Sequence, residues 1–384
     1  MTQPVLGILT LYLNDAGLLE ERDYYRRMTE EGEKLGLNVI VFTPQDVNYK
    51  QNRIYALYYD AESRQWKRKW TSFPHLIFDR CRIQQSRRYE QLLKFRSRYS
   101  DQTYLNRPLR NKWAIHSILS KDDRFSPYLP KTRYIESTDD IKEMLRSHSL
   151  LYLKPINGTG GRGILRIERN EDGTLLVEGR DQLRRIVKPK RISEQRLGVY
   201  LSSWALKEKR YIAQQGIQLK LRSGRVHDYR LLVQKDGSGQ WQVTGCAGRI
   251  GAPKSITANL HGGGRAVKMD ALLREWIGDE DKIAYIKEDV ERFGVNVARY
   301  LELCYDALCE LAIDIAIDKK GKIWMIEVNP KPAREVFNRA GEPAVYRNAI
   351  VRPLEYALWT YKEQLQKKVQ KPPLKKVKGR RGTD

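Results

Sequence analysis

The segment Leu151–Ile164, which reads LYLKPINGTGGRGI, most restricts what this chain can fold into. An apolar run ends at Lys154 and leads into a loop whose glycines are Gly158, Gly160, Gly161 and Gly163. Glycine has no Cβ, so backbone N–H groups can close around phosphate oxygens, while Lys154 and Arg162 add positive charge. The spacing fits neither a Walker A motif nor GxGxxG. The segment predicts a strand followed by a phosphate-binding loop, with a plain hairpin turn as the alternative.

A second informative segment, Ala312–Pro332, reads AIDIAIDKKGKIWMIEVNPKP. Asp314 lies in an apolar strand, Asp318–Gly321 has turn chemistry, and a second strand ends in Glu327 and Asn329. A hairpin would bring the two carboxylates and the amide to one end of two paired strands. Such oxygen donors suit Mg²⁺ or Mn²⁺. We favour a metal site, because a charged side chain in an apolar strand is costly to bury unless it is paired or metal-bound; the alternative for Glu327 is a cross-strand charge pair.

The composition is that of an ordinary soluble globular protein. The 384 residues are 41% hydrophobic and 31% charged, and no run approaches the roughly 18 apolar residues of a membrane helix. The start of the chain is expected to be a strand and not a signal peptide. The four cysteines show no CxxC spacing, which favours reduced thiols and synthesis in the cytoplasm, and the five scattered histidines give no zinc or Ser-His-Asp pattern.

The net charge of +24 is unusual. Part of it lies in Lys367–Asp384, where eight basic residues accompany one acid; this tail has few apolar residues and is expected to be disordered. Such charge implies attraction to polyanions, with an ordinary solvated basic surface as an equal alternative. Aromatic and basic residues alternate along Ile54–Trp70. A two-stranded ribbon packed in a sheet explains this pattern more simply than nucleic-acid binding does.

The beginning of the chain predicts a small parallel α/β domain. Pro4–Tyr12 reads as a strand, Ala16–Leu35 as an amphipathic helix and Asn38–Phe42 as a second strand. Further on, the segment from Leu151 to about Gly251 reads as strands and turns, and Tyr285–Cys309 reads as a long helix. Other helices are expected at Lys112–Leu119, Thr138–His148 and Tyr346–Gln366.

The order of the motifs resembles that of the ATP-grasp superfamily. The matching pieces are Lys112 before a helix, Lys154 before the glycine loop, Asp228-Tyr-Arg230, Arg249, the loop Asn259–Gly264, and Asp314 with Glu327-x-Asn329. The phrases YIAQQGIQL, HDYRLLVQ, WQVTGCAGRIG, TANLHGGG and IEVNPKP resemble the YheC/YheD-type endospore coat-associated proteins more closely. This resemblance covers most of the chain but not the basic tail.

The resemblance implies an α/β (α+β) fold: an ATP-grasp domain preceded by a parallel α/β pre-ATP-grasp domain. The implied domains are 1–105 for the amino-terminal domain and 106–366 for the ATP-grasp domain, followed by the tail at 367–384. Within the ATP-grasp domain, a nucleotide subdomain would cover about 106–217 and a catalytic and metal-binding subdomain about 218–366.

The resemblance also assigns roles to individual residues. Lys112, Lys154 and the glycine loop with Arg162 would hold ATP, and Asp314, Glu327 and Asn329 would hold Mg²⁺ or Mn²⁺. Arg230 and Arg249 would hold the γ-phosphate and the acylphosphate. The adenine-binding hinge would be Ala213–Ile217, comprising Gln214, Gln215, Gly216 and Ile217. Most superfamily members have a glutamate in this hinge, so the two glutamines are a departure, and no ribose-binding acid follows them.

The implied activity is that of an ATP-dependent carboxylate–amine ligase that acts through an acylphosphate on small-molecule or peptide substrates. The resemblance further implies association with the endospore coat, with coat proteins or anionic polymers as partners of the basic tail. Two alternatives stay open: a non-catalytic structural component of the coat on an ATP-grasp scaffold, and a polyanion-binding protein.

Overall fold

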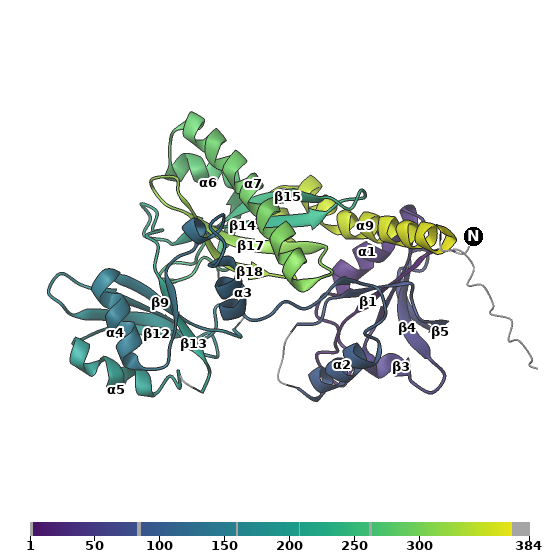
Figure 1. Ribbon diagram of the computed structural model, residues 1–384, viewed down its shortest axis with the longest axis horizontal. Coiled ribbons are helices and arrows are strands. Elements are labelled where there is room, and N and C mark those ends of the chain that lie inside the picture. The colour runs from purple at the N-terminus through teal and green to yellow at the C-terminus, as the bar shows by residue number, and fades with distance from the viewer. Residues whose placement is uncertain (1–2, 83–85, 159, 207, 261–262, 371–384) are drawn as a thin grey trace, which may run out of the picture. The chain divides into compact units, whose positions relative to one another are not determined.

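The computed structural model describes residues 3–82, 86–158, 160–206, 208–260 and 263–370. The chain divides into two compact units (Figure 1). Unit 1 contains the residues up to Leu105, the short segment Lys235–Gln240 and the chain from Val351 onward. Unit 2 contains Asn106–Gln234 and Trp241–Ile350. Among the described helices, none has the length and apolar character needed to cross a membrane.

Unit 1 is built on a seven-stranded sheet with a parallel centre. Its strands are β1 (Val5–Leu9), β2 (Asn38–Phe42), β3 (Val47–Asn48), β4 (Arg53–Asp60), β5 (Gln65–Ser72), β6 (Leu76–Asp79) and β7 (Tyr104–Asn106). The order is β3-β4-β2-β1-β6-β7, with β5 paired to β4, and β1 runs parallel to both β2 and β6. The predicted parallel β-α-β beginning and the antiparallel β4–β5 ribbon are therefore confirmed.

Helices cover this sheet. They are α1 (Arg22–Lys34), the short η1 (Pro44–Asp46), α2 (Arg87–Arg98) and the part of α9 (Pro343–Gln370) that begins at Val351. Helix α1 packs closely on β2, because a Cβ on Gly32 would lie 2.5 Å from Val39 Cγ2. Helix α9 holds to the same unit through Gln364, which donates to Thr103 Oγ1 at 2.6 Å, and through Tyr361, whose ring is 5.0 Å from that of His75. Residues 367–370 of the expected tail are helical, whereas 371–384 lie outside the described residues.

The first sheet of unit 2, sheet 2, has six antiparallel strands in the order β12-β11-β10-β9-β13-β8. They are β8 (Thr132–Tyr134), β9 (Leu150–Pro155), β10 (Ile164–Arg169), β11 (Leu175–Arg180), β12 (Ile186–Ile192) and β13 (Tyr211–Gln215). The helices that accompany it are α4 (Thr138–Ser147), η3 (Glu194–Arg196) and α5 (Leu197–Ser202). Alternate residues such as Leu153, Ile167 and Ala213 form a core with these helices, which leaves the other face of the sheet to polar side chains.

The second sheet of unit 2, sheet 3, has five strands in the order β16-β15-β14-β17-β18. They are β14 (His227–Lys235), β15 (Trp241–Ile250), β16 (Arg265–Lys268), β17 (Glu310–Ile317) and β18 (Ile323–Asn329), accompanied by α3 (Lys112–Leu119), η2 (Ser126–Tyr128), α6 (Met269–Trp276), α7 (Glu280–Tyr305) and α8 (Glu335–Arg339). One face packs against α6 and α7 in a large apolar core that includes Leu231 and Ile313. Their strand neighbours Arg230 and Asp314 therefore point to the opposite face.

The helices at Lys112–Leu119 and Thr138–Ser147 match the sequence predictions closely. The long helix α7 exists as predicted, but it spans Glu280–Tyr305 and so begins and ends a few residues before the predicted Tyr285–Cys309. Ser137 caps α4 and shares a capping box with Asp140, as the run of polar residues there predicts. The prediction of strands and turns alone from Leu151 to Gly251 was wrong at η3 and α5. Only Leu197 and Leu201 of α5 are buried, so its apolar pattern is too short to stand out.

Candidate functional site

The β17–β18 hairpin brings the predicted metal ligands together. Asp314 and Glu327 are direct cross-strand partners, and Asn329 is paired with Ala312 two residues away. Direct partners in an antiparallel pair project from the same face, so all three side chains share the face that lies opposite the apolar core. A β-bulge follows Asp314, because Ile315 pairs with Met325 and one residue of β18 is left unpaired.

Asp314 lies between two arginines from neighbouring strands. Arg230, its cross-strand partner on β14, donates to it through Nε at 2.5 Å and through Nη2 at 3.0 Å. Arg249 on β15 lies 3.0 Å from Asp314 Oδ2 through Nη2 and makes two further hydrogen bonds to Asp228, at 2.6 and 2.7 Å. Burial raises the pKa of Asp314, but the two guanidinium charges outweigh it and hold the pKa below its ordinary value.

Lys112 joins the second carboxylate to the glycine loop. It is the first residue of α3, whose amino end is capped by Asn111. Its ammonium lies 3.3 Å from Glu327 Oε1 and also donates to the carbonyl oxygen of Gly158. Of these two side chains, Lys112 is 19% exposed and Glu327 26%, so both remain accessible to a ligand.

Lys154 lies on the polar face of sheet 2. Its ammonium donates to Gln214 Oε1 at 2.6 Å and lies 5.7 Å from the centre of the Tyr152 ring. Burial lowers the pKa of Lys154 to about 8, against the attraction of Glu327 and with the repulsion of Lys112. The positive charge of Lys154 is only weakly neutralised by its neighbours, and an anionic ligand would stabilise the charged form.

The predicted glycine loop joins β9 to β10. Because these strands are antiparallel, the loop is also the hairpin connection that was considered as the alternative. Gly160 and Gly161 have φ values of +65° and +76°, which residues other than glycine rarely adopt. A Cβ on Gly160 would lie 2.5 Å from Arg184 Nη2, and one on Gly161 would lie 2.7 Å from Asn259 Nδ2. The loop therefore needs glycine for close approach as well as for its backbone conformation.

The two glutamines of the predicted hinge have different environments. Gln214 accepts from Lys154 on the polar face, whereas Gln215 accepts from the backbone N–H of Lys131 at the edge strand. Gly216 follows, and a Cβ there would overlap the Leu150 side chain. Ile217 is half-buried beyond the end of β13. Only Gln214 of this group is brought to Lys154.

Sequence reasoning did not assign a role to three residues near this site. Asp228 accepts a hydrogen bond from Arg249. The Asp-x-Arg spacing could have indicated this role, because it places Asp228 and Arg230 on one face of β14. Arg180 and Arg184 lie beside the glycine loop at the end of β11 and in the following turn. Their sequence neighbourhood gave no motif, and only the strand pairing brings them there.

The donor set fits a hard divalent cation. Within the described residues, no three His, Cys, Asp or Glu side chains lie close enough to form a metal site by themselves. Asp314, Glu327 and Asn329 offer two carboxylates and an amide oxygen instead, which is typical of Mg²⁺ when substrate phosphates complete the coordination.

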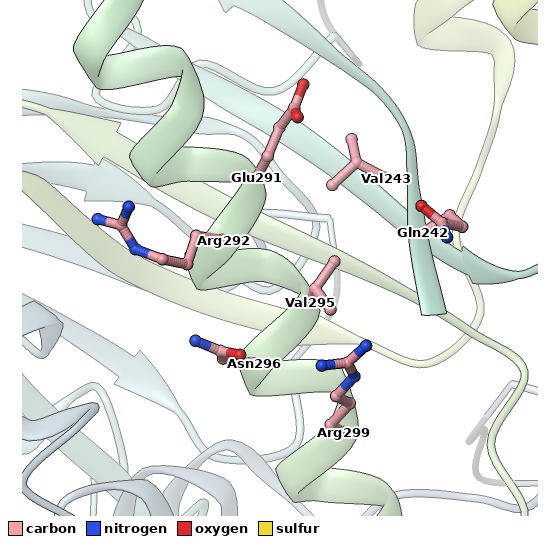
Figure 2. Close-up of a pocket in the computed structure, with 7 residues that line it drawn as sticks. All are labelled: Gln242, Val243, Glu291, Arg292, Val295, Asn296 and Arg299. Atoms are coloured by element: carbon pink, nitrogen blue, oxygen red, sulfur yellow. The ribbon is translucent and has the colours of Figure 1, made fainter. Parts of the chain in front are cut away.

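A pocket of about 340 Å³ lies elsewhere in unit 2 (Figure 2). It is lined by α7 and the beginning of β15, through Gln242, Val243, Glu291, Arg292, Val295, Asn296 and Arg299. None of the predicted site residues lines it. Since α7 covers the apolar face of sheet 3, the pocket is separate from the carboxylate and arginine cluster.

Comparisons with known proteins show which family this chain is similar to. A family model described as YheC/D-like ATP-grasp matches residues 101–359. The chain is 27% identical to the endospore coat-associated protein YheC of Bacillus subtilis (strain 168), over 94% of this chain and 99% of that protein. It is 26% identical to the endospore coat-associated protein YheD of the same organism, over 92% of this chain and 78% of that protein.

A solved structure extends the likeness to the fold. The VanG D-Ala:D-Ser ligase from Enterococcus faecalis matches with a TM-score of 0.56 and 11% identity, over 93% of this chain and all of that chain. At this identity the match concerns the fold alone, and the fold is that expected from the motif order. The family match, which spans well over half of the residues, shows that the chain belongs to the YheC/D-like ATP-grasp family.

Proposed function

We propose that this chain is an ATP-dependent, Mg²⁺-requiring carboxylate–amine ligase. The observation that carries the proposal is the cross-strand pair of Asp314 and Glu327, with Arg230 and Arg249 bound to the first and Lys112 to the second. Five charged groups converge there and come from five different elements. The three cations neutralise these carboxylates in the free protein, and the same cations are the groups that would bind the phosphates of a nucleotide.

In this proposal Lys112 and Lys154 bind the phosphates of the nucleotide. Lys112 already contacts Gly158, and Lys154 lies at the end of the strand that leads into the glycine loop. The positive-φ glycines let the loop approach the phosphates without side-chain interference. Gln214, beside Lys154 and followed by the hinge backbone, would face the adenine end of the nucleotide.

Asp314, Glu327 and Asn329 would hold the metal. When bound, Mg²⁺ would neutralise charge on the phosphates and help to orient them. Arg230 and Arg249 would stabilise the negative charge of the phosphoryl group during transfer. Asp228 orients Arg249 through two hydrogen bonds, so the guanidinium keeps a fixed position while its second contact, to Asp314, is exchanged for a substrate oxygen.

The chemistry needs no nucleophilic side chain. The carboxylate oxygen of the first substrate attacks the γ-phosphorus of ATP, ADP leaves, and an acylphosphate is formed. The amine of the second substrate then attacks the acyl carbon, inorganic phosphate leaves with the C–O bond electrons, and the proton that the amine loses passes to the released phosphate or to solvent as the amide forms. The protein's residues bind, orient and neutralise charge throughout.

The substrate class in this proposal is a small molecule or peptide that carries a carboxylate, joined to an amine. The family membership supports a ligase, and the structural neighbour named above is a ligase for amino acids. Both named relatives are endospore coat-associated proteins, and on that ground we propose the endospore coat as the place where this chain acts. Spore-coat proteins or anionic polymers bound by the basic tail remain part of this proposal.

The test is a search for ATP-dependent coupling. The full chain is incubated with Mg²⁺, ATP and mixtures of amino acids or peptides, and ADP release is measured together with the masses of new products. The proposal predicts ADP in proportion to a product whose mass equals the two substrates minus water. ATP binding without turnover in any mixture would favour the non-catalytic scaffold, and salt-dependent binding of polyanions without ATP binding would favour the polyanion-binding protein.

A further inference from the structure

Three arginines gather at the glycine loop. Arg162 belongs to the loop, Arg180 ends β11, and Arg184 lies in the turn between β11 and β12. That turn is held by Asp181, which accepts from the backbone N–H of Leu183 at 2.8 Å. Strand pairing of Arg180 with Ile164 places its side chain on the polar face of sheet 2.

Gly158 and Gly160 of the loop have different neighbours. At Gly158 the backbone carbonyl accepts from Lys112, which in turn pairs with Glu327. At Gly160 the space that a Cβ would occupy is taken by Arg184 Nη2, 2.5 Å away. The arginines therefore occupy a position of their own at the tip of the loop.

The three arginines have no carboxylate partner in the part of the chain that the structure describes. Among the described residues, no carboxylate forms an ion pair with Arg162, Arg180 or Arg184. Arg180 is only 6% exposed, yet its one hydrogen-bond partner is the neutral hydroxyl of Ser255, 3.1 Å from Nη2, and its Nε has no partner in the described part of the chain. The Nε of Arg184 is likewise buried without a partner there. Burial, with repulsion from Arg162 and Arg180, lowers the pKa of Arg184.

A neighbouring arginine shows what a structural role looks like on this face. Arg166 on β10 is buried to a similar degree, but it is neutralised by Glu168 at 2.7 Å and Glu178 at 2.8 Å. Buried cations normally have such partners, because desolvating an unpaired charge is costly. Asp181 is engaged by Leu183 and Arg185, and no described carboxylate pairs with Arg180 or Arg184, which leaves that role to an external anion.

We propose that Arg162, Arg180 and Arg184 form a subsite for a phosphate or carboxylate group at the tip of the glycine loop. Guanidinium groups suit such oxyanions because their N–H donors match two oxygens at once. The subsite deepens the proposed function and rests on it for the identity of the oxyanion. That oxyanion is either the terminal phosphate of the nucleotide or an acidic group of the substrate.

The test begins with inorganic phosphate as the probe. Binding to the full chain is measured by calorimetry for the wild type, Arg184→Gln and Arg180→Gln. The control is Arg191→Gln, which removes an arginine from the same β11–β12 hairpin that is well exposed and paired with Asp172. Losing a charge-assisted contact should weaken phosphate binding about tenfold or more in the first two variants and leave the control unchanged. Melting temperatures check that each variant folds. If Arg180→Gln does not fold, Arg184→Gln still tests the proposal, because Arg184 is only half-buried.

Nucleotides then distinguish the two sources of the oxyanion. If the subsite holds the terminal phosphate, Arg184→Gln weakens Mg·ATP binding about tenfold while Mg·ADP binding stays unchanged. If it holds an acid of the substrate, both nucleotides bind as in the wild type, and phosphate still binds when Mg·ATP is saturating. A folded Arg184→Gln variant that binds phosphate, ADP and ATP like the wild type overturns the subsite. Arg184-dependent phosphate binding in a chain that does not bind Mg·ATP would keep the subsite and contradict the proposed function instead.

Discussion

Lys154 and Gln214 lie on adjacent strands of one antiparallel sheet, and the ammonium of Lys154 donates to the amide oxygen of Gln214 at 2.6 Å. The amide satisfies a hydrogen bond but carries no charge to neutralise the lysine. The glutamate that most superfamily members have in the hinge would supply that charge. Burial lowers the pKa of Lys154 to about 8, and the neutral amide of Gln214 adds no charge that would oppose this shift.

Nucleotide affinity is therefore expected to depend on pH through Lys154. As the pH rises from 7 to 9, the free protein loses the Lys154 charge, so Mg·ATP binding should weaken. The Mg·ATP affinity of Lys154→Ala should depend less on pH over this range. In Gln214→Glu, the loss of affinity should occur at a higher pH than in the wild type. Calorimetry in buffers of equal ionic strength measures the Kd for Mg·ATP at each pH. The same pH dependence of Kd in the wild type and in Lys154→Ala would contradict a role of Lys154 in this effect.

The same pKa shift predicts the opposite sign for stability. Between pH 8 and the ordinary pKa of lysine, the unfolded chain binds one more proton at Lys154 than the folded chain does. The contribution of Lys154 to the free energy of unfolding therefore rises with pH in this window. Denaturant titrations of the wild type and Lys154→Met at pH 7 and pH 9 measure it. A contribution that falls with pH would show that Lys154 is not buried as described.

Lys154→Ala should weaken nucleotide binding more than Lys112→Ala does. Lys112 already shares its charge with Glu327, whereas Lys154 has only a neutral partner. Loss of a charge-assisted contact to phosphate costs roughly 1.5–3 kcal/mol, or about 10- to 150-fold in Kd. Equal Kd values for Lys154→Ala and the wild type would show that the loop is only a hairpin turn and does not bind phosphate.

Asp314→Asn should be much more destabilising than Glu327→Gln. Asp314 is the shared partner of Arg230 and Arg249, and removing its charge leaves two buried cations with incomplete compensation. Breaking such a buried pair costs about 3–5 kcal/mol, whereas an accessible pair such as Lys112–Glu327 is worth about 1 kcal/mol or less. Denaturant unfolding compares the two variants, and equal losses would mean that Asp314 does not hold the arginines.

Much of the site was predictable because its signals are local. The apolar run around Asp314, the turn at Asp318–Gly321 and the position of Glu327 in the second strand together predict the hairpin that the structure contains. The glycines after Lys154 likewise predict a loop directly after a strand. In each case the residues lie within about twenty positions of one another.

The rest depended on strand pairing between distant segments. Arg230 and Asp314 are 84 residues apart, and nothing local to either shows that they are cross-strand partners. The sequence also presents Gln214 and Gln215 as equals, whereas strand alternation turns only Gln214 toward Lys154. Arg180 and Arg184 were missed for the same reason, since only the pairing of β10 with β11 brings that hairpin to the glycine loop.

The basic tail is expected to act by charge alone. Deleting residues 371–384 removes six basic residues and one acid. Retention on an anionic matrix should fall at low salt and converge with that of the full chain at high salt, because the attraction is screened. The melting temperature should stay unchanged. A clear drop in melting temperature would show that the tail packs on the folded chain, and equal retention would assign anion binding to the folded part.

The central claim is that Glu327 helps to hold the metal on which nucleotide binding depends. The most direct measurement is the Mg²⁺ dependence of ATP affinity for the wild type, Glu327→Gln and the matched control Glu291→Gln, whose side chain lines the separate pocket beside α7. We expect Mg²⁺ to strengthen ATP binding in the wild type and in the control, and we expect this gain to be lost in Glu327→Gln while the melting temperature of the variant is kept. An undiminished Mg²⁺ effect in Glu327→Gln would contradict the metal site and the ligase proposed from it.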